Sequence, residues 1–130
     1  MSTVDTILYD RIADQKRLRF IINNIKQHIP ADGTVLDVGC GNGVISRALG
    51  KEGFRVRGID VSEKTIEIAR QQSTLPNVQF DCVSAEALTL EQEKYDAIVC
   101  SEVLEHLDNP SNLLESLYKT LKTHGVLIVT

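Results

Sequence analysis

The sequence has 130 residues, enough for a single domain that buries a core without disulfide bonds. Its 42% hydrophobic and 25% charged residues suit a soluble folded protein, and no apolar run approaches the roughly 20 residues that span a membrane. Fourteen basic and eighteen acidic residues give a formal charge of −4, which argues against a broad basic surface for nucleic acid but does not exclude a local patch.

Cysteine usage and the first residues indicate the compartment. Cys40, Cys82 and Cys100 are an odd number without paired spacing, so we interpret them as reduced thiols. The first residues carry acidic side chains early and hold no apolar core of signal-peptide length. Together these features predict a cytoplasmic protein without a membrane span.

Helical and extended patterns alternate along the chain. Apolar residues spaced on one helical face mark the helices, and short apolar runs mark the strands. Ser62 and Pro110 each suit the start of a helix. In chain order, the predicted elements are a helix at 7–29, a strand at 34–38, a helix at 44–51, a strand at 55–59, a helix at 63–72, strands at 78–83 and 95–100, a helix from 110 to about 123, and a strand at 126–130.

This alternation predicts an α/β fold, a parallel sheet with helices on both faces. Right-handed crossovers favour a doubly wound arrangement, preceded by a helical segment at residues 1–30. Ligands of such sheets bind beyond the carboxyl ends of the strands, near the point where the strand order reverses. Each loop of unusual composition in this chain follows a strand, so we expect these loops to meet at that edge.

The strongest signal is the segment VLDVGCGNG, residues 35–43. Its alternating glycines allow a tight turn and the close approach of a ligand, and the following helix presents free N–H groups. The dinucleotide fingerprint G-x-G-x-x-G would need its third glycine at Val44, one residue later than here. Asp37 would repel a pyrophosphate and suits a cationic ligand, such as one with an amino group and a sulfonium. The alternative is an ordinary glycine turn.

A second signal is the segment GIDV, in which Asp60 ends the second predicted strand 17 residues after Gly43. A carboxylate at this place can accept both hydroxyls of a ribose. Aspartate also caps turns, but its register with the glycine segment favours the ribose.

In this order, the segments VLDVGCGNG, GIDVS and YDAIVCSEVLEHL resemble successive motifs of the class I S-adenosylmethionine-dependent methyltransferases. The resemblance covers about residues 15–130. It implies a Rossmann-like, mostly parallel sheet of order 3-2-1-4-5, with S-adenosylmethionine as cofactor and S-adenosylhomocysteine as product. The cofactor-binding residues that it implies are Asp37, Gly39, Cys40 and Gly41 around the methionine portion, Asp60 at the ribose, and Val61, Cys100 and Ser101 beside them.

Two further cofactor contacts follow from the resemblance. The family usually has an acidic residue near the adenine amino group after the third strand, where this chain has Ser84. Ser84 and Ala85 are the candidates there, through a hydroxyl or backbone groups, unless Ser84 is a turn residue only. Arg17 resembles an arginine that contacts the cofactor in ubiquinone-biosynthesis O-methyltransferases, unless it is a solvated helix charge.

Glu102, Glu105 and His106 follow the fourth predicted strand with helical i, i+3 and i+4 spacing. On one helical face they could bind magnesium or manganese. The same spacing occurs in the metal site of small-RNA 3′-terminal 2′-O-methyltransferases, where a second histidine beyond the fifth strand completes the site. The alternative is that Glu102 borders the cofactor, Glu105 is solvated and His106 packs locally. Glu102 and His106 are also our candidates for catalysis at an oxygen nucleophile.

The segment after the fourth strand resembles the ubiquinone-biosynthesis O-methyltransferases particularly closely, which implies methyl transfer to an oxygen of a small molecule. Two alternatives remain, a metal-dependent RNA 3′-terminal 2′-O-methyltransferase and a non-catalytic cofactor-binding module. Nucleic acid is disfavoured by the charge of −4. A nicotinamide dehydrogenase is opposed by the glycine spacing and by Asp37.

The sheet of this family normally has seven strands, and the sequence shows five. The last of them, residues 126–130, is an apolar run. We therefore expect one C-terminally truncated cofactor-binding domain over residues 1–130, which associates with itself through the exposed fifth strand.

Overall fold

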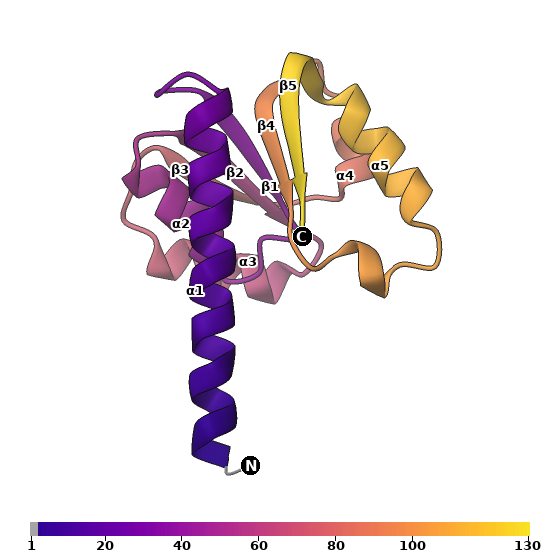
Figure 1. Cartoon of the computed structure of the whole chain (residues 1–130). Coiled ribbons are helices and arrows are strands. Elements are labelled where there is room, and N and C mark those ends of the chain that lie inside the picture. The colour runs from indigo at the N-terminus through magenta and orange to yellow at the C-terminus, as the bar shows by residue number, and fades with distance from the viewer. Residues whose placement is uncertain (1–2) are drawn as a thin grey trace.

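The computed structural model describes the backbone of residues 3–130 and the side chains from residue 13 onward (Figure 1). Helices and strands alternate as the sequence predicts. The helices are α1 (Thr3–His28), α2 (Val44–Lys51), α3 (Glu63–Gln72), α4 (Ala85–Leu88), the 3₁₀ helix η1 (Leu104–His106) and α5 (Pro110–Lys119); the strands are β1 (Thr34–Val38), β2 (Arg55–Asp60), β3 (Val78–Cys82), β4 (Tyr95–Cys100) and β5 (Leu121–Val129).

The described strands form one parallel sheet in the order β3-β2-β1-β4-β5. This order confirms the predicted fold class. The order reverses beside β1, where the chain leaves β2 and β3 on one side and returns with β4 and β5 on the other.

Side chains that alternate along each strand pack against helices on opposite faces of the sheet. On one face, Val35 of β1 packs with Ile21 and Ile25 of α1 and with Leu49 of α2. On the other face, Leu36 and Val38 belong to a second cluster with Leu88 of α4 and with Leu113 and Leu117 of α5. No helix of the described chain has the length and apolar character to cross a membrane.

Two predicted helix starts are confirmed. The Ser62 hydroxyl accepts a hydrogen bond from the Thr65 N–H at 3.2 Å, as an N-cap should, and α3 begins at the next residue. Pro110 is the first residue of α5, where its missing N–H costs no helical hydrogen bond.

The prediction of a helix to residue 123 and a strand from 126 is wrong. Helix α5 ends at Lys119, and β5 already begins at Leu121. Leu121 has helical spacing from Leu117, but the buried Thr120 ends the helix, because its N–H and its hydroxyl both donate to the Leu117 carbonyl. The register then shifts between the pairs Tyr95–Leu121 and Ala97–Val126, so the residues between them leave the ladder.

Helix α4 was not predicted, because its residues read as a polar connection. It begins after Ser84, whose hydroxyl accepts a hydrogen bond from the Ala87 N–H at 3.2 Å. The pattern of serine followed by an acid in the first turn was the available signal for this helix start. Other differences are small: α1 starts at Thr3, β2 reaches Asp60, and β3 ends at Cys82.

Candidate functional site

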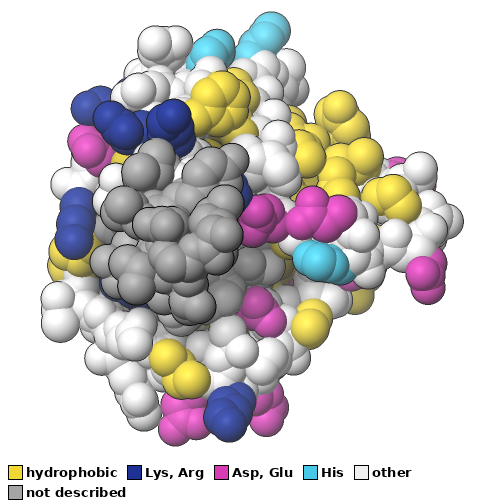
Figure 2. All heavy atoms as spheres, turned by 60° about the horizontal axis from the view of Figure 1, so that its bottom comes forward, with side chains coloured by type: hydrophobic (Ala, Val, Ile, Leu, Met, Phe, Trp, Pro, Cys, Tyr) yellow, Lys and Arg dark blue, Asp and Glu magenta, His cyan; other side chains and the backbone are white. Residues whose placement is uncertain are grey.

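The loops that follow β1, β2, β3 and β4 meet at the carboxyl edge of the sheet, as the parallel topology requires. In register, Val38 at the end of β1 lies beside Ile59 of β2 and Cys100 of β4. Figure 2 shows the molecule from this side, with acidic, basic and hydrophobic side chains interspersed on the surface.

Backbone conformation explains the glycines of the β1–α2 loop. Gly39 has a φ of 67°, and a Cβ there would lie 2.6 Å from Cγ2 of Val103. Gly41 has a φ of 56°, and no described atom lies within 4 Å of the position of its missing Cβ. Only glycine adopts such angles without strain. The loop therefore packs tightly against Val103 at Gly39 and offers an open approach to its backbone at Gly41.

Asp60 connects this loop to the start of α3. Its carboxylate accepts the Gly41 N–H at 3.2 Å on one oxygen and the Ser62 N–H at 3.0 Å on the other. These bonds fix the carboxylate at the end of β2, and each oxygen keeps a lone pair for a further donor. The arrangement suits a ligand that presents two hydroxyl groups.

Asp60 also lines a cavity of about 190 Å³, which we call the Asp60 cavity. Five residues predicted to bind the cofactor lie together there, although they come from three different loops. They are Gly39, Asp60, Val61, Ser84 and Ala85. The sequence analysis missed the other lining residues, which are Val38, Ile59, Val83, Glu86, Val103, Leu107 and Leu113. All of these except Glu86 are apolar, and for an apolar residue a core position and a ligand contact look alike in sequence.

A second cavity, of about 440 Å³, lies between α1, the glycine loop and the turn after β4; we call it the Arg17 cavity. Arg17 donates from one terminal nitrogen to Asp14 at 3.0 Å and from the other to Glu102 at 2.7 Å. The lining residues are Asp14, Gln15, Arg17, Leu18, Asn42, Val44, Ile45 and Glu102. The structure thus brings Arg17 to the glycine loop, at Asn42.

Asp37 lies behind the glycine loop and, within the described chain, lines neither cavity. Its carboxyl group is 1% exposed and accepts the Ser46 hydroxyl hydrogen bond at 2.7 Å. Burial raises the pKa of Asp37 to about 7, although hydrogen bonds from Ser46 act in the opposite direction. Its effect on a ligand would therefore be electrostatic and would depend on its protonation.

The cysteines at this edge point into the core. Cys40 packs with Ile66, Ala69 and Phe80, so only its backbone belongs to the loop surface. Burial raises the pKa of the Cys40 thiol to about 12 and that of Cys100 to about 11. Among the described side chains, neither cysteine lines either cavity. Both thiols are therefore protonated and shielded from solvent.

The helical face that the spacing of Glu102, Glu105 and His106 predicts after β4 is not formed in the structure. Glu102 has a φ of 57° and lies before η1, and its N–H donates to the Thr130 carbonyl at 2.9 Å. The Glu102 carboxylate pairs with Arg17. Of the two glutamates, only Glu105 contacts His106, with 3.6 Å between His106 Nε2 and Glu105 Oε1. Among the residues with described side chains, no group of three His, Cys, Asp or Glu is placed to hold a metal ion.

Ser101 and His106 lie near the cavities without lining them, as far as the described residues define these spaces. The Ser101 hydroxyl hydrogen-bonds the Thr130 hydroxyl at 2.6 Å and so ties the turn after β4 to the end of β5. The side chain of His106 is 76% exposed.

Comparisons with known proteins agree with this geometry. A family model described as a methyltransferase domain matches residues 9–130. The chain is 36% identical over 117 residues to a protein of Rickettsia bellii named ubiquinone biosynthesis O-methyltransferase, covering 88% of this chain and 49% of that protein. A protein of the same name from Coxiella burnetii is 39% identical over 107 residues, covering 79% and 45%. The chain thus spans about half the length of these relatives.

Solved structures show the same fold. Coclaurine N-methyltransferase, bound to N-methylheliamine and SAH, aligns with a TM-score of 0.78 at 25% identity, over 90% of this chain and 35% of that one. The match of the family model to nearly the whole sequence and the 3-2-1-4-5 sheet together show that this chain belongs to the class I S-adenosylmethionine-dependent methyltransferases.

Proposed function

We propose that the chain binds S-adenosylmethionine across the two cavities and serves the transfer of its methyl group to an oxygen of a small molecule. The observation that carries the proposal is the placement of Asp60. Its carboxylate is fixed by Gly41 and Ser62, and it lines a cavity with residues of the loops after β1, β2 and β3. A ribose in the Asp60 cavity would donate its two hydroxyls to this carboxylate.

The described residues of the Asp60 cavity fit a nucleoside. Val61, which is 75% exposed, and Ala85 both line the cavity and supply apolar surface for a base. The Ser84 hydroxyl accepts the Ala87 N–H and keeps its own proton to donate. Glu86 adds a carboxylate at this end, and its oxygens make no hydrogen bond to any described residue, so they can accept from an amino group.

The Arg17 cavity fits an amino-acid portion. The guanidinium of Arg17 already pairs with carboxylates, and a ligand carboxylate could take the place of Glu102 or Asp14. Gly41, next to Asn42 of this cavity, has open space where its Cβ would stand, so its backbone is accessible to a ligand. Asp37 lies behind the loop and, when ionised, favours a ligand with an amino group and a sulfonium.

S-adenosylmethionine, when bound, supplies a methyl group that the positive charge on sulfur has already activated. The residues of this chain would hold and align it, which is the main contribution that such a displacement needs from the protein. The oxygen acceptor is supported by the similarity to the two ubiquinone biosynthesis O-methyltransferases. The catalytic roles of Glu102 and His106 stay predictions.

Titration calorimetry of the chain with S-adenosylhomocysteine and with NAD⁺ tests the proposal. We expect S-adenosylhomocysteine to bind and NAD⁺ to give no heat of binding. Asp60→Ala should weaken S-adenosylhomocysteine binding by about 1–3 kcal/mol, because hydrogen bonds to a charged group are lost.

Asp60 also holds the glycine loop, so the ligand must be varied as well as the protein. The 2′-deoxy analogue of S-adenosylhomocysteine should bind the wild type more weakly than the parent compound does. Asp60→Ala should no longer distinguish the two ligands, whereas Asp60→Asn should keep part of the preference. If the chain binds NAD⁺ tightly and S-adenosylhomocysteine not at all, the proposed function is wrong.

A further inference from the structure

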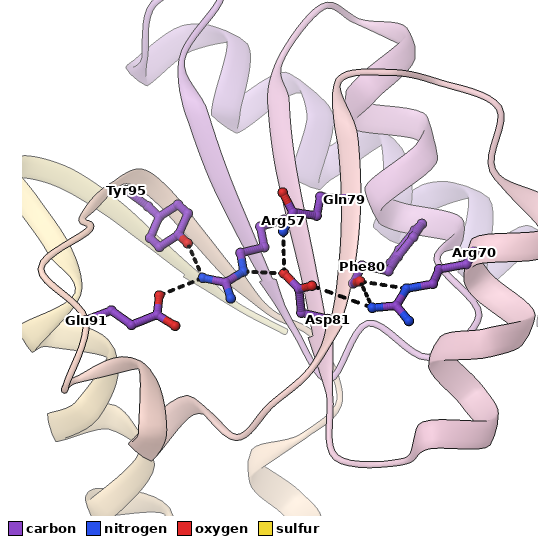
Figure 3. Close-up of polar contacts among 7 residues, drawn as sticks. All are labelled: Arg57, Arg70, Gln79, Phe80, Asp81, Glu91 and Tyr95. Atoms are coloured by element: carbon purple, nitrogen blue, oxygen red, sulfur yellow. Dashed lines mark hydrogen bonds and ion pairs between the residues drawn. The ribbon is translucent and has the colours of Figure 1, made fainter.

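A polar cluster lies on the face of β2 and β3 near α4, outside the two cavities of the carboxyl edge (Figure 3). Arg57 of β2 is its centre. Its Nε donates to Asp81 of β3 at 2.7 Å, and its Nη1 donates to Glu91 at 2.8 Å and to the Tyr95 hydroxyl at 3.2 Å. We call Arg57, Asp81, Glu91 and Tyr95 the Arg57 cluster.

The sheet side of the Arg57 cluster is firmly held. Asp81 also accepts a hydrogen bond from Gln79 Nε2 at 2.8 Å and lies 3.6 Å from Arg70 Nη2, which itself donates to the Phe80 carbonyl (Figure 3). The Arg57 side chain is only 17% exposed. Burial by itself would lower the pKa of Arg57, but its hydrogen bonds to Glu91, Tyr95 and Asp81 raise it, so the group stays charged. Arg57 is therefore a fixed cation on the sheet.

Glu91 connects Arg57 to α4. Three consecutive hydrogen bonds extend the helical backbone beyond α4. The N–H groups of Thr89, Leu90 and Glu91 donate to the carbonyls three residues earlier, at 3.3, 3.2 and 3.0 Å. Glu91 therefore ends a hydrogen-bonded segment that is continuous with α4. Helix α4 has only four residues, too few to be stable without tertiary contacts.

The opposite end of α4 lines the Asp60 cavity. Ser84, Ala85 and Glu86 are the residues that contribute there, and Leu88 anchors the helix in the core at 1% exposure. Arg57 and the cavity therefore act on the same short helix from its two ends. A helix released at Glu91 would keep Leu88 buried but could tilt or fray about it.

We propose that Arg57 is a positioning residue for the adenine end of the cofactor site, which acts through Glu91 and α4 without touching the ligand. This inference rests on the proposed function, because it takes the Asp60 cavity as the nucleoside site. Adenine and hypoxanthine differ in hydrogen bonding at their N1 and C6 positions. Discrimination between them depends on where residues 84–86 lie, whereas the ribose contact depends on Asp60.

The test compares S-adenosylhomocysteine with S-inosylhomocysteine by titration calorimetry. The wild type should prefer the adenosyl compound. Glu91→Ala should lower affinity for the adenosyl compound about fivefold and leave affinity for the inosyl compound within about twofold, so that the preference falls. Glu91→Gln keeps an oxygen that accepts from Arg57, and it should keep most of the preference. The side chain of Glu91 is 43% exposed, so these variants do not threaten the fold.

Glu93→Ala is the matched control. Glu93 lies in the same segment of the chain as Glu91, and both line a surface cavity together with Arg57. Replacing Glu93 by alanine removes the same charge, but among the described residues Glu93 forms no ion pair with Arg57. This variant should leave both affinities within about twofold of the wild type.

Three results would overturn the inference: unchanged affinities in Glu91→Ala, an equal loss for both ligands, or the same change in Glu93→Ala. If the wild type binds neither ligand, the proposed function itself fails. If it binds both and prefers neither, the Asp60 cavity does not recognise adenine and the positioning role is wrong.

Discussion

Two aspartates of neighbouring strands show how local contacts set charge at the scale of single residues. Burial raises the pKa of Asp37 on β1 to about 7. The pKa of Asp96 on β4 is lowered, chiefly by the backbone N–H of Thr34, which donates to its carboxylate at 2.9 Å. The two groups therefore oppose each other in the pH dependence of folding.

The pKa of Asp37 predicts a loss of stability as the pH rises. Its ordinary pKa is 3.8, so between that value and about 7 the folded chain holds a proton that the unfolded chain has released. The free energy of unfolding then falls as the pH rises through this window. Relative to Asp37→Asn, the wild type should lose about 2 kcal/mol between about pH 5 and about pH 8, measured by urea unfolding.

Asp96→Asn serves as the control with the opposite sign. Because the pKa of Asp96 is lowered, its contribution is present above the ordinary aspartate range and is lost as the pH falls through its folded pKa. This variant should weaken the loss of stability in acid and leave the slope above about pH 5 as it is in the wild type. An Asp37→Asn protein with the wild-type slope would show that Asp37 ionises freely in the folded chain.

The sequence predicts which candidate residues lie together where a strand end fixes their place. Gly39, Asp60 and Ser84 gather in one cavity because each lies at or just after the end of a parallel strand, and all such strands end at one edge. Glu105 and His106 do not join Glu102, because the left-handed backbone at Glu102 breaks the helical spacing. Residue type gives no signal for that turn, since φ values above zero are uncommon for glutamate.

At the scale of elements, the sequence predicts where a helix or strand begins and ends if turn residues or glycines flank a single apolar pattern. Strands β1 and β4 and helix α2 have the predicted bounds, because turns or glycines flank their apolar patterns. The start of β5 was missed because Leu121 fits both the stripe of α5 and the ladder beside Tyr95. That choice depends on a strand 26 residues earlier, which a local pattern cannot include.

The two ends of α3 offer a matched pair of serines for a test of capping. The Ser62 hydroxyl accepts from the Thr65 N–H and from the Thr65 hydroxyl, at 3.2 and 2.9 Å. The buried Ser73 hydroxyl, at the other end, has no hydrogen-bond partner among the described residues. In thermal or urea unfolding, Ser62→Ala should cost about 1 kcal/mol, and Ser73→Ala should cost nothing or stabilise the chain. Equal losses at the two positions would refute the capping role.

At the scale of the whole molecule, α1 belongs to the core of the domain. Ile21, Ile25 and Ile29 pack on the sheet with Val35 and Val99, although the first part of α1 extends past the carboxyl edge of the sheet (Figure 1). Arg17 connects the same helix to the turn after β4 through Glu102. The helical segment in front of the sheet therefore contributes both to the core and to the lining of the Arg17 cavity.

Truncation of one buried side chain of α1 should measure this contribution. Ile25 is fully buried, so Ile25→Ala should lower the free energy of unfolding by about 2–5 kcal/mol. Phe20, on the same helix and 54% exposed, is the control, and Phe20→Ala should change the free energy by no more than about 0.5 kcal/mol. If both variants unfold at the urea concentration of the wild type, α1 does not share the cooperative core.

The central place of β1 has a consequence for the nascent chain. Its neighbour β4 comes much later in the sequence, and the contact between Thr34 and Asp96 spans 62 residues. At about 5–20 residues per second, the ribosome needs about 3–12 s to make the intervening chain. During that time the apolar strand emerges with one flank unpaired and is available to a chaperone that binds extended hydrophobic segments.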